Sequence, residues 1–313
     1  MGRFKIVLLM FLLGFMTIIG CASDEEKKAA FVDKGKAYFK KGEYKSAELE
    51  FKHAIQIDPK YTEAYVKLGE TQLKLGNSKG AFDAYSMVAR LDPDNTEAQL
   101  KLATFYLLGN KLAESRTKVD AILVKEPNNI EALFLLSGIM EQEKNLDESE
   151  KTLKNILKLD NNQSRVYIGL SRLMTRQGKT AEAERILKQG VTQRPDDINL
   201  HLALFRFYIQ NNAYDLAEAE IEKTIDLNPK NADLHIDLGN FYFSQKNMAK
   251  AETAYQEAIK IDLNTIKPYI VIARFYDATG NKAETLSMYQ KALDLQPKDI
   301  RIMDAIARFH VKN

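Results

Sequence analysis

The chain has 313 residues, of which 28% are charged and 45% apolar, a balance typical of globular proteins and not of disordered ones. It contains only 15 glycines and 7 prolines, so helix is favoured throughout. Apart from Arg3 and Lys5 in the first twenty residues, 43 of the 45 basic residues remain, against 43 acidic ones. This neutral balance provides no electrostatic attraction to nucleic acid. A single cysteine excludes an intramolecular disulfide and a thiolate-rich zinc site.

Residues 1–20 have the pattern of a signal peptide. Arg3 and Lys5 precede an apolar stretch over residues 6–19, which is shorter than the ~20 residues of a membrane span. The stretch ends in "IIGC", which places the only cysteine at Cys21. This segment resembles the lipobox of bacterial lipoproteins, with an aliphatic residue three positions before the cysteine and a small residue directly before it. The resemblance implies a lipoprotein signal peptide, cleavage before Cys21, and acylation of the Cys21 sulfur and the new amino terminus.

Two other interpretations of this segment stay open, an uncleaved signal anchor and a chance cysteine in an ordinary signal peptide. Ala22 follows the cysteine where an inner-membrane retention signal would have Asp. By resemblance to Gram-negative lipoproteins, the protein is expected in the cell envelope, lipid-anchored at the periplasmic face of the outer membrane. Residues 21–27 are expected to form a short tether before a first helix near Lys28, so that the N-terminal end of the following helical part lies close to the bilayer and its C-terminal half lies further out.

From residue 28 onward, a pattern recurs every 34 residues. Apolar-rich segments such as "AIQIDP" and "VARLDP" end at each recurrence, and the turns between, such as "KGEY" and "LGNS", contain Gly or Asn, which tolerate the left-handed conformation that ends a helix. The recurring positions are Pro59, Pro93, Pro127, Asn161, Pro195, Pro229, Leu263 and Pro297.

This pattern resembles the tetratricopeptide repeat family, whose unit is a helix–turn–helix pair. The resemblance implies an all-α, right-handed solenoid of eight repeats over residues 28–298, followed by a capping helix over residues 299–313. The eighth position of each repeat is usually small, so that the paired helices approach closely. Phe205 occupies it in the sixth repeat, which weighs against equally close packing there. On the final helix, Phe309 and Val311 are expected to leave apolar surface.

No group of residues in the chain has the pattern of a catalytic site. We find no nucleophile elbow, no phosphate-binding glycine loop and no paired catalytic carboxylates. His201 and His235 fall at the same position of consecutive repeats, which raises the hypothesis of a metal site. No third ligand stands at a suitable spacing, and a half-buried packing role explains both rings better. The sequence therefore predicts no catalytic residue, no metal and no cofactor.

In this family the concave groove is lined by the first helix of each repeat, and it is the expected site of a protein partner. The fifth position of the repeat is apolar in all eight cases, which is consistent either with a core covered by neighbouring helices or with the floor of a groove for a helix or extended peptide. These residues are Val32, Val66, Leu100, Phe134, Ile168, Leu202, Ile236 and Ile270.

Charge along the expected groove is unevenly distributed. The second position is acidic in repeats two to four, and the ninth position is basic in most repeats from the fifth onward. Either these charges are simply solvated, or the basic part binds an acidic segment of a partner. The residues are Glu63, Glu97 and Glu131, and then Arg172, Arg206, Arg274 and Arg308.

The resemblance implies a membrane-anchored scaffold that binds protein partners in the groove and the lipid bilayer through acylated Cys21, with no nucleic acid. Its first expected role is the assembly of a cell-envelope complex such as a type IV pilus, a secretion machine or an export machine. The alternatives are an adaptor that recruits a peptidoglycan hydrolase or a protease, and a component of exopolysaccharide export. A binder of glycan or lipoprotein cargo would need aromatic platforms. For these the chain offers only Phe39, Phe134 and Phe243, and no tryptophan.

Overall fold

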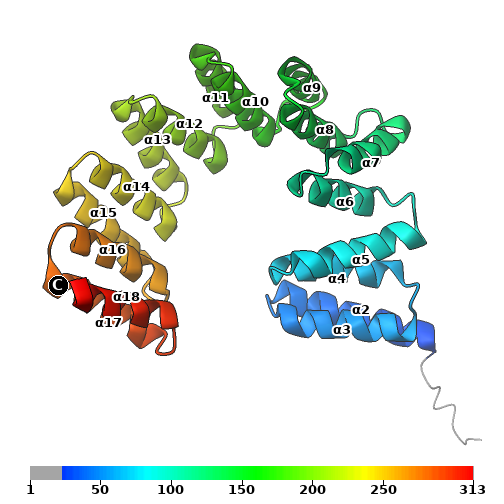
Figure 1. Ribbon diagram of the computed structural model, residues 1–313, viewed down its shortest axis with the longest axis horizontal. Coiled ribbons are helices and arrows are strands. Elements are labelled where there is room, and N and C mark those ends of the chain that lie inside the picture. The colour runs from blue at the N-terminus through cyan, green and yellow to red at the C-terminus, as the bar shows by residue number, and fades with distance from the viewer. Residues whose placement is uncertain (1–22, 313) are drawn as a thin grey trace, which may run out of the picture. The chain divides into compact units, whose positions relative to one another are not determined.

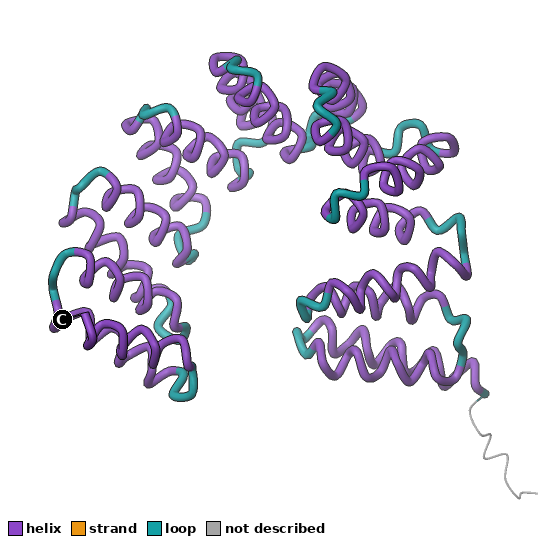
Figure 2. Tube along the Cα trace, in the orientation of Figure 1, coloured by secondary structure: helices purple, strands orange, loops and turns teal. Residues whose placement is uncertain are grey.

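The computed structural model describes residues 23–312, and these form 17 α-helices and no strand (Figures 1 and 2). None of the helices in this part of the chain has both the length and the apolarity to cross a membrane. The predicted signal peptide and Cys21 lie outside the described residues. The helices are α2 (Asp24–Lys40), α3 (Tyr44–Ile57), α4 (Thr62–Lys74), α5 (Ser78–Leu91), α6 (Thr96–Leu108), α7 (Leu112–Lys125), α8 (Ile130–Gln142), α9 (Leu146–Leu159), α10 (Ser164–Arg176), α11 (Thr180–Gln193), α12 (Ile198–Gln210), α13 (Tyr214–Leu227), α14 (Ala232–Ser244), α15 (Met248–Ile261), α16 (Ile266–Ala278), α17 (Lys282–Leu295) and α18 (Ile300–Lys312).

The helices form eight pairs, from α2 with α3 to α16 with α17, and α18 stands as the first helix of a ninth unit. From Thr62 to Ile300 every first helix begins 34 residues after the one before it, at the starts that the sequence period predicts. The chain divides into two compact units, Met1–Ile156 and Leu157–Asn313, with the boundary inside α9. The all-α repeat architecture expected from the sequence is confirmed.

The first helix begins earlier than expected, at Asp24 and not near Lys28. Ser23 and Glu26 form a capping box, in which the Ser23 side chain accepts a hydrogen bond from the Glu26 backbone N–H and Glu26 accepts one from the Ser23 N–H. The first turn also carries three negative charges, which stabilise the helix by interacting with the positive end of its dipole. They belong to Asp24, Glu25 and Glu26. The tether predicted for residues 21–27 is therefore wrong from Asp24 onward, where the chain is helical.

Every turn within a repeat is closed by one residue in the left-handed conformation, as the Gly and Asn content predicts. In the third repeat this residue is Asn110, and the glycine before it, Gly109, has an ordinary negative φ. In the fourth and seventh repeats it is a lysine, which the sequence pattern did not indicate and which is strained there. The eight residues, with φ between 57 and 80°, are Gly42, Gly76, Asn110, Lys144, Gly178, Asn212, Lys246 and Gly280.

Packing inside a repeat depends on a small residue of the first helix facing a large one of the second. A Cβ atom at Gly35 would lie 2.5 Å from the ring of Phe51, and one at Gly239 would lie 2.5 Å from the ring of Tyr255. In the sixth repeat the sizes are exchanged, because Phe205 on the first helix is accompanied by Ile221 at the place of those rings. Both Phe205 and Ile221 are buried, so the larger side chain is accommodated on the first helix. The expectation of less close helix packing in this repeat stays a prediction.

Neighbouring repeats are joined by hydrogen bonds from a first helix to the second helix of the repeat before it. In the second unit three tyrosine hydroxyls donate to glutamates 24 residues earlier, and in the first unit Gln72 makes the equivalent bond to Glu48. These bonds fix the spacing between repeats on the side of the second helices. The tyrosine pairs are Tyr208 with Glu184 at 3.1 Å, Tyr242 with Glu218 at 2.5 Å, and Tyr276 with Glu252 at 2.6 Å.

Candidate functional site

The apolar fifth-position residues lie partly beneath neighbouring side chains. Val32, Val66 and Ile236 are buried and belong to the core, at 1%, 9% and 5% exposure. The side chains of the other five are partly exposed to solvent, and none of the eight is fully exposed. Some of the fifth-position residues therefore belong to the core, as the first interpretation expects. The others keep surface that a bound helix or peptide could contact, as the groove interpretation expects. The half-buried members are Leu100, Phe134, Ile168, Leu202 and Ile270.

The ninth-position arginines of the second unit point their charge into solvent. Arg172 on α10, Arg206 on α12 and Arg274 on α16 are all exposed. Within the described residues, none of the three makes a hydrogen bond or a salt bridge, in contrast to several lysines on the second helices. Guanidinium groups without an internal partner are available to a carboxylate or phosphate from outside the chain.

A cavity of about 380 Å³ lies between α10 and α12 and brings three of the predicted residues together. Ile168 and Phe207 contribute apolar lining, and Arg172 and Arg206 lie beside them. Arg176 is a further lining residue that the sequence analysis missed. Its position four residues after Arg172 could have indicated it, because residues four apart share a helix face. Arg274 and the other fifth-position residues do not line this cavity.

The carboxyl group of Asp237 responds to the charge of Arg206. Asp237 on α14 is half-buried, and burial raises the pKa of its carboxyl above the ordinary value of 3.8, while Arg206 acts in the opposite direction. Asp237 forms no salt bridge with Arg206 at contact distance in the described structure. Arg206 therefore acts on Asp237 from a distance and not through an ion pair.

One of the acidic residues predicted for the first unit, Glu63, is paired within the chain. Lys36 makes a salt bridge to Glu63 at 2.6 Å, and hydrogen bonding by Lys36 lowers the pKa of the Glu63 carboxyl. Lys67 pairs with Glu70 at 2.9 Å in the same way. Glu97 is exposed.

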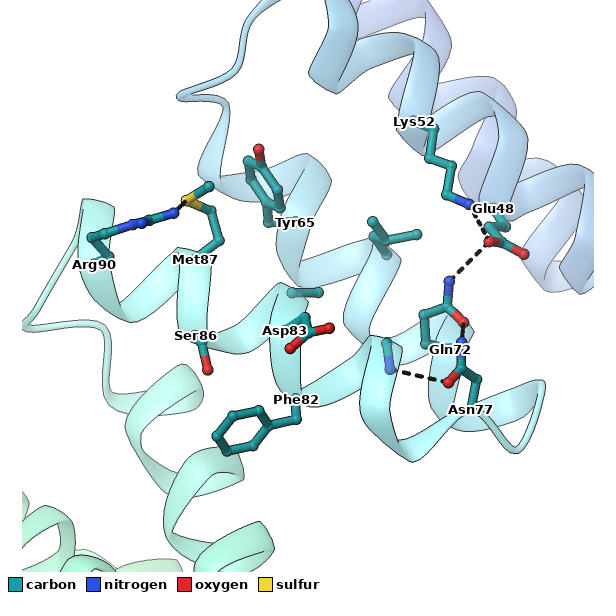
Figure 3. A pocket seen from close by; sticks show the side chains of 13 residues that line it. Glu48, Lys52, Tyr65, Gln72, Asn77, Phe82, Asp83, Ser86, Met87 and Arg90 are labelled. Carbon is teal, nitrogen blue, oxygen red and sulfur yellow. Dashed lines mark hydrogen bonds and ion pairs between the residues drawn. The ribbon is translucent and has the colours of Figure 1, made fainter.

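A second concavity, of about 850 Å³, lies among α3, α4 and α5 in the first unit (Figure 3). Glu48 accepts hydrogen bonds from Lys52 and from Gln72, and Asn77 donates to Gln72 at 2.9 Å. These groups satisfy one another, so this wall offers few free hydrogen-bonding atoms. Figure 3 shows Phe82 among the other lining residues. No repeat position that we expected to bind a partner lies in this concavity.

The two histidines considered for a metal site differ in their surroundings. His201 is 4% exposed, and its Nδ1 lies 2.7 Å from a carboxylate oxygen of Glu220 while its Nε2 lies 2.9 Å from the carbonyl oxygen of Pro195. Both ring nitrogens are therefore engaged by the chain itself. His235 on α14 lines a separate cavity among α13, α14 and α15. In the described part of the chain, no three histidine, cysteine or acidic side chains are grouped so as to hold a metal ion.

Comparison with protein families identifies the repeats. Four models of the tetratricopeptide repeat match, over residues 35–76, over 66–130 and 202–263, over 174–226, and over 266–299. The chain therefore contains tetratricopeptide repeats, which generally form non-catalytic scaffolds for protein–protein interaction.

Solved structures support the same fold. A tetratricopeptide repeat protein from Parabacteroides merdae has 21% sequence identity and a TM-score of 0.59, with 80% of this chain and 98% of that chain covered. The human IFIT1 dimer with PPP-AAAA has 19% identity and a TM-score of 0.54, with 86% and 72% covered. At these identities the likeness shows the fold alone. No curated protein sequence matches the chain.

Proposed function

We propose that this protein is a membrane-anchored scaffold that binds a partner protein on the first-helix face of its second unit, in the assembly of a cell-envelope complex such as a pilus, secretion or export machine. The observation that carries the proposal is the cavity between α10 and α12, where Arg172 and Arg206 flank the apolar surface of Ile168 and form no ion pair with any residue in the described part of the chain. Such a lining suits an acidic side chain with apolar neighbours, because it supplies both charge-assisted hydrogen bonds and apolar contact.

The anchor in this proposal is an acylated Cys21. Its support is the order of basic residues, apolar stretch and "IIGC" at the start of the sequence. Because α2 begins at Asp24, three residues after Cys21, an anchored chain would have its first helix within about 10 Å of the bilayer. Several acyl chains give stable attachment where a single chain gives only marginal binding.

The anchor is tested by the substitution Cys21→Ser in the full-length chain. We expect the wild type in the membrane fraction and the variant released from it, with mass spectrometry showing lipid on the amino-terminal peptide of the wild type alone. A Cys21→Ser protein that stays membrane-bound after its leader has been removed contradicts the anchor.

The binding face is tested by charge reversal of Arg172 and Arg206 to glutamate. The matched control reverses Lys223 and Lys291, two exposed lysines at equivalent places on the second helices α13 and α17. Each charge-assisted hydrogen bond contributes roughly 1.5–3 kcal/mol to binding. After cross-linking in membranes and purification, we therefore expect the amount of partner protein bound to the arginine variant to be at least about tenfold lower than for the wild type. Equal retention by the arginine variant and the wild type removes this face from the proposal.

A further inference from the structure

The last helix, α18, has one face that the other first helices keep covered. In α16 the fourth and eighth positions of the repeat are Tyr269 and Ala273, at 7% and 0% exposure beneath the second helix α17. In α18 the same positions are Met303 and Ala307, and both are exposed. Within the described residues no helix packs on this face of α18.

The opposite face of α18 is firmly packed on the repeat before it. Ile302 is 1% exposed and belongs to the same core cluster as Tyr289 and Ala292 of α17. Phe309 is 6% exposed, so the expectation that it leaves apolar surface is wrong, whereas Val311 is 90% exposed as expected. Figure 1 shows α18 in red beside α17. The open face therefore belongs to a docked helix and not to a frayed end.

The open face carries a continuous apolar stripe. Ile300, Met303, Ala307 and Val311 are spaced by three, four and four residues, which places them on one side of a helix. Ile300 and Val311, at 78% and 90% exposure, stand at the two ends of the stripe. An apolar stripe of this kind on a docked helix indicates a contact surface.

The stripe is complementary to itself when two copies of α18 run in opposite directions. Ile300 of one copy then faces Val311 of the other, and the large Met303 faces the small Ala307. Beside the stripe, Asp304 and Arg308 form an exposed salt bridge at 2.8 Å within the chain. In the antiparallel pair, where the same flank of each helix meets that of the other, each Asp304 also faces an Arg308 of the second copy.

We propose that this face of α18 binds α18 of a second copy of the chain in an antiparallel dimer with two-fold symmetry. A single pair of helices buries less than the roughly 1,600 Å² of a standard protein interface, so the association depends on concentration. Confinement of the copies to one membrane would favour it, because it raises their effective concentration.

The proposal is tested by disulfide cross-linking of the full-length chain carrying Ile300→Cys and Val311→Cys together. Within one chain these residues are about 16 Å apart along the helix, and a disulfide needs Cα atoms within about 7 Å, so the two cysteines cannot bond to each other in the same copy. Across the antiparallel pair they are opposite. Under mild oxidation we expect at least about tenfold more disulfide-linked dimer than either single variant gives.

The control pair is Leu108→Cys with Val124→Cys, because these residues are equally exposed, at 79% and 83%, but lie in the first unit. This pair should give no more dimer than the wild type. In the double-cysteine variant, Asp304→Arg should block the cross-link by opposing like charges, and adding Arg308→Asp should restore it.

Three results overturn the proposal, each read in variants whose circular dichroism matches the wild type. The first is the absence of dimer from the double-cysteine variant across the concentration series. The second is an equally strong dimer from Val311→Cys alone, which would indicate a parallel pair. The third is cross-linking to other proteins in place of a second copy.

Discussion

A methyl group added at Gly239 tests the close approach of α14 and α15 that shapes the repeat. The new Cβ atom would lie 2.5 Å from Cδ1 and Cε1 of Tyr255. The ring cannot readily move, because Tyr255 is 2% exposed and its hydroxyl donates a hydrogen bond to Asn240 at 2.8 Å. Overpacking of this kind costs about 1–3 kcal/mol, and alanine returns about 1 kcal/mol of helix propensity. We therefore expect Gly239→Ala to lose about 1 kcal/mol of stability.

The matched control is Gly138→Ala on α8, where the nearest atom is the end of the Leu107 side chain at 3.2 Å. A flexible methyl group can give way, so the helix-propensity gain of about 1 kcal/mol should remain in large part. Urea unfolding followed by circular dichroism should separate the two variants by about 2 kcal/mol. Because repeats couple mainly to their neighbours, hydrogen exchange should accelerate in α14 and α15 of Gly239→Ala. A Gly239→Ala protein as stable as Gly138→Ala would refute the reasoning.

The further predictions concern the turns and the contacts between repeats. Lys246→Gly should raise the free energy of unfolding by about 0.5–1 kcal/mol, because Lys246 has a φ of 59°, which glycine adopts without strain. Gly178→Ala should lower the free energy of unfolding, because Gly178 has a φ of 73°. Thermal unfolding measures both changes, and a lower midpoint for Lys246→Gly would contradict its predicted stabilisation. Tyr242→Phe should cost about 1 kcal/mol through the lost hydrogen bond to Glu218, and wild-type stability in urea would contradict this. Hydrogen bonds from Lys250 and then Tyr242 hold the pKa of the Glu218 carboxyl below its ordinary value of 4.5. The stability that this pairing contributes is therefore complete above pH 4.5 and is lost as the pH falls through the lower folded pKa. The loss of stability in Lys250→Met should shrink over that acid range, and a loss that grows there would contradict the pairing.

Much of the fold could be predicted because it follows from a repeated local rule. Gly, Asn and Pro punctuate each 34-residue unit, and the first helices from α4 onward begin at the predicted residues. The start of α2 was missed because the Ser23 capping box lies before the first full repeat, where no period guides the assignment. The packing of Phe205 could not be foreseen either, because it depends on the smaller Ile221 on a different helix.

The candidate site was predictable only in part. Repeat position placed Arg172 and Arg206 on one face, and the structure adds that they share a cavity with Ile168. The degree of burial of the fifth-position row did not follow from the pattern, because it depends on the size of neighbouring side chains. Likewise the pairing of Glu63 with Lys36 involves side chains from two repeats, and a periodic pattern on one helix does not indicate it.

The most direct test of the scaffold proposal is site-specific photo-cross-linking in membranes, which maps the face that a partner covers. One photoreactive residue replaces Gln210, which lines the cavity between α10 and α12, and in a separate variant one replaces Lys223 on α13. We predict a specific protein adduct from position 210, its loss when Arg172 and Arg206 are reversed to glutamate, and no such adduct from position 223. An adduct formed equally from position 223, or one that persists at position 210 after the charge reversal, would contradict the account.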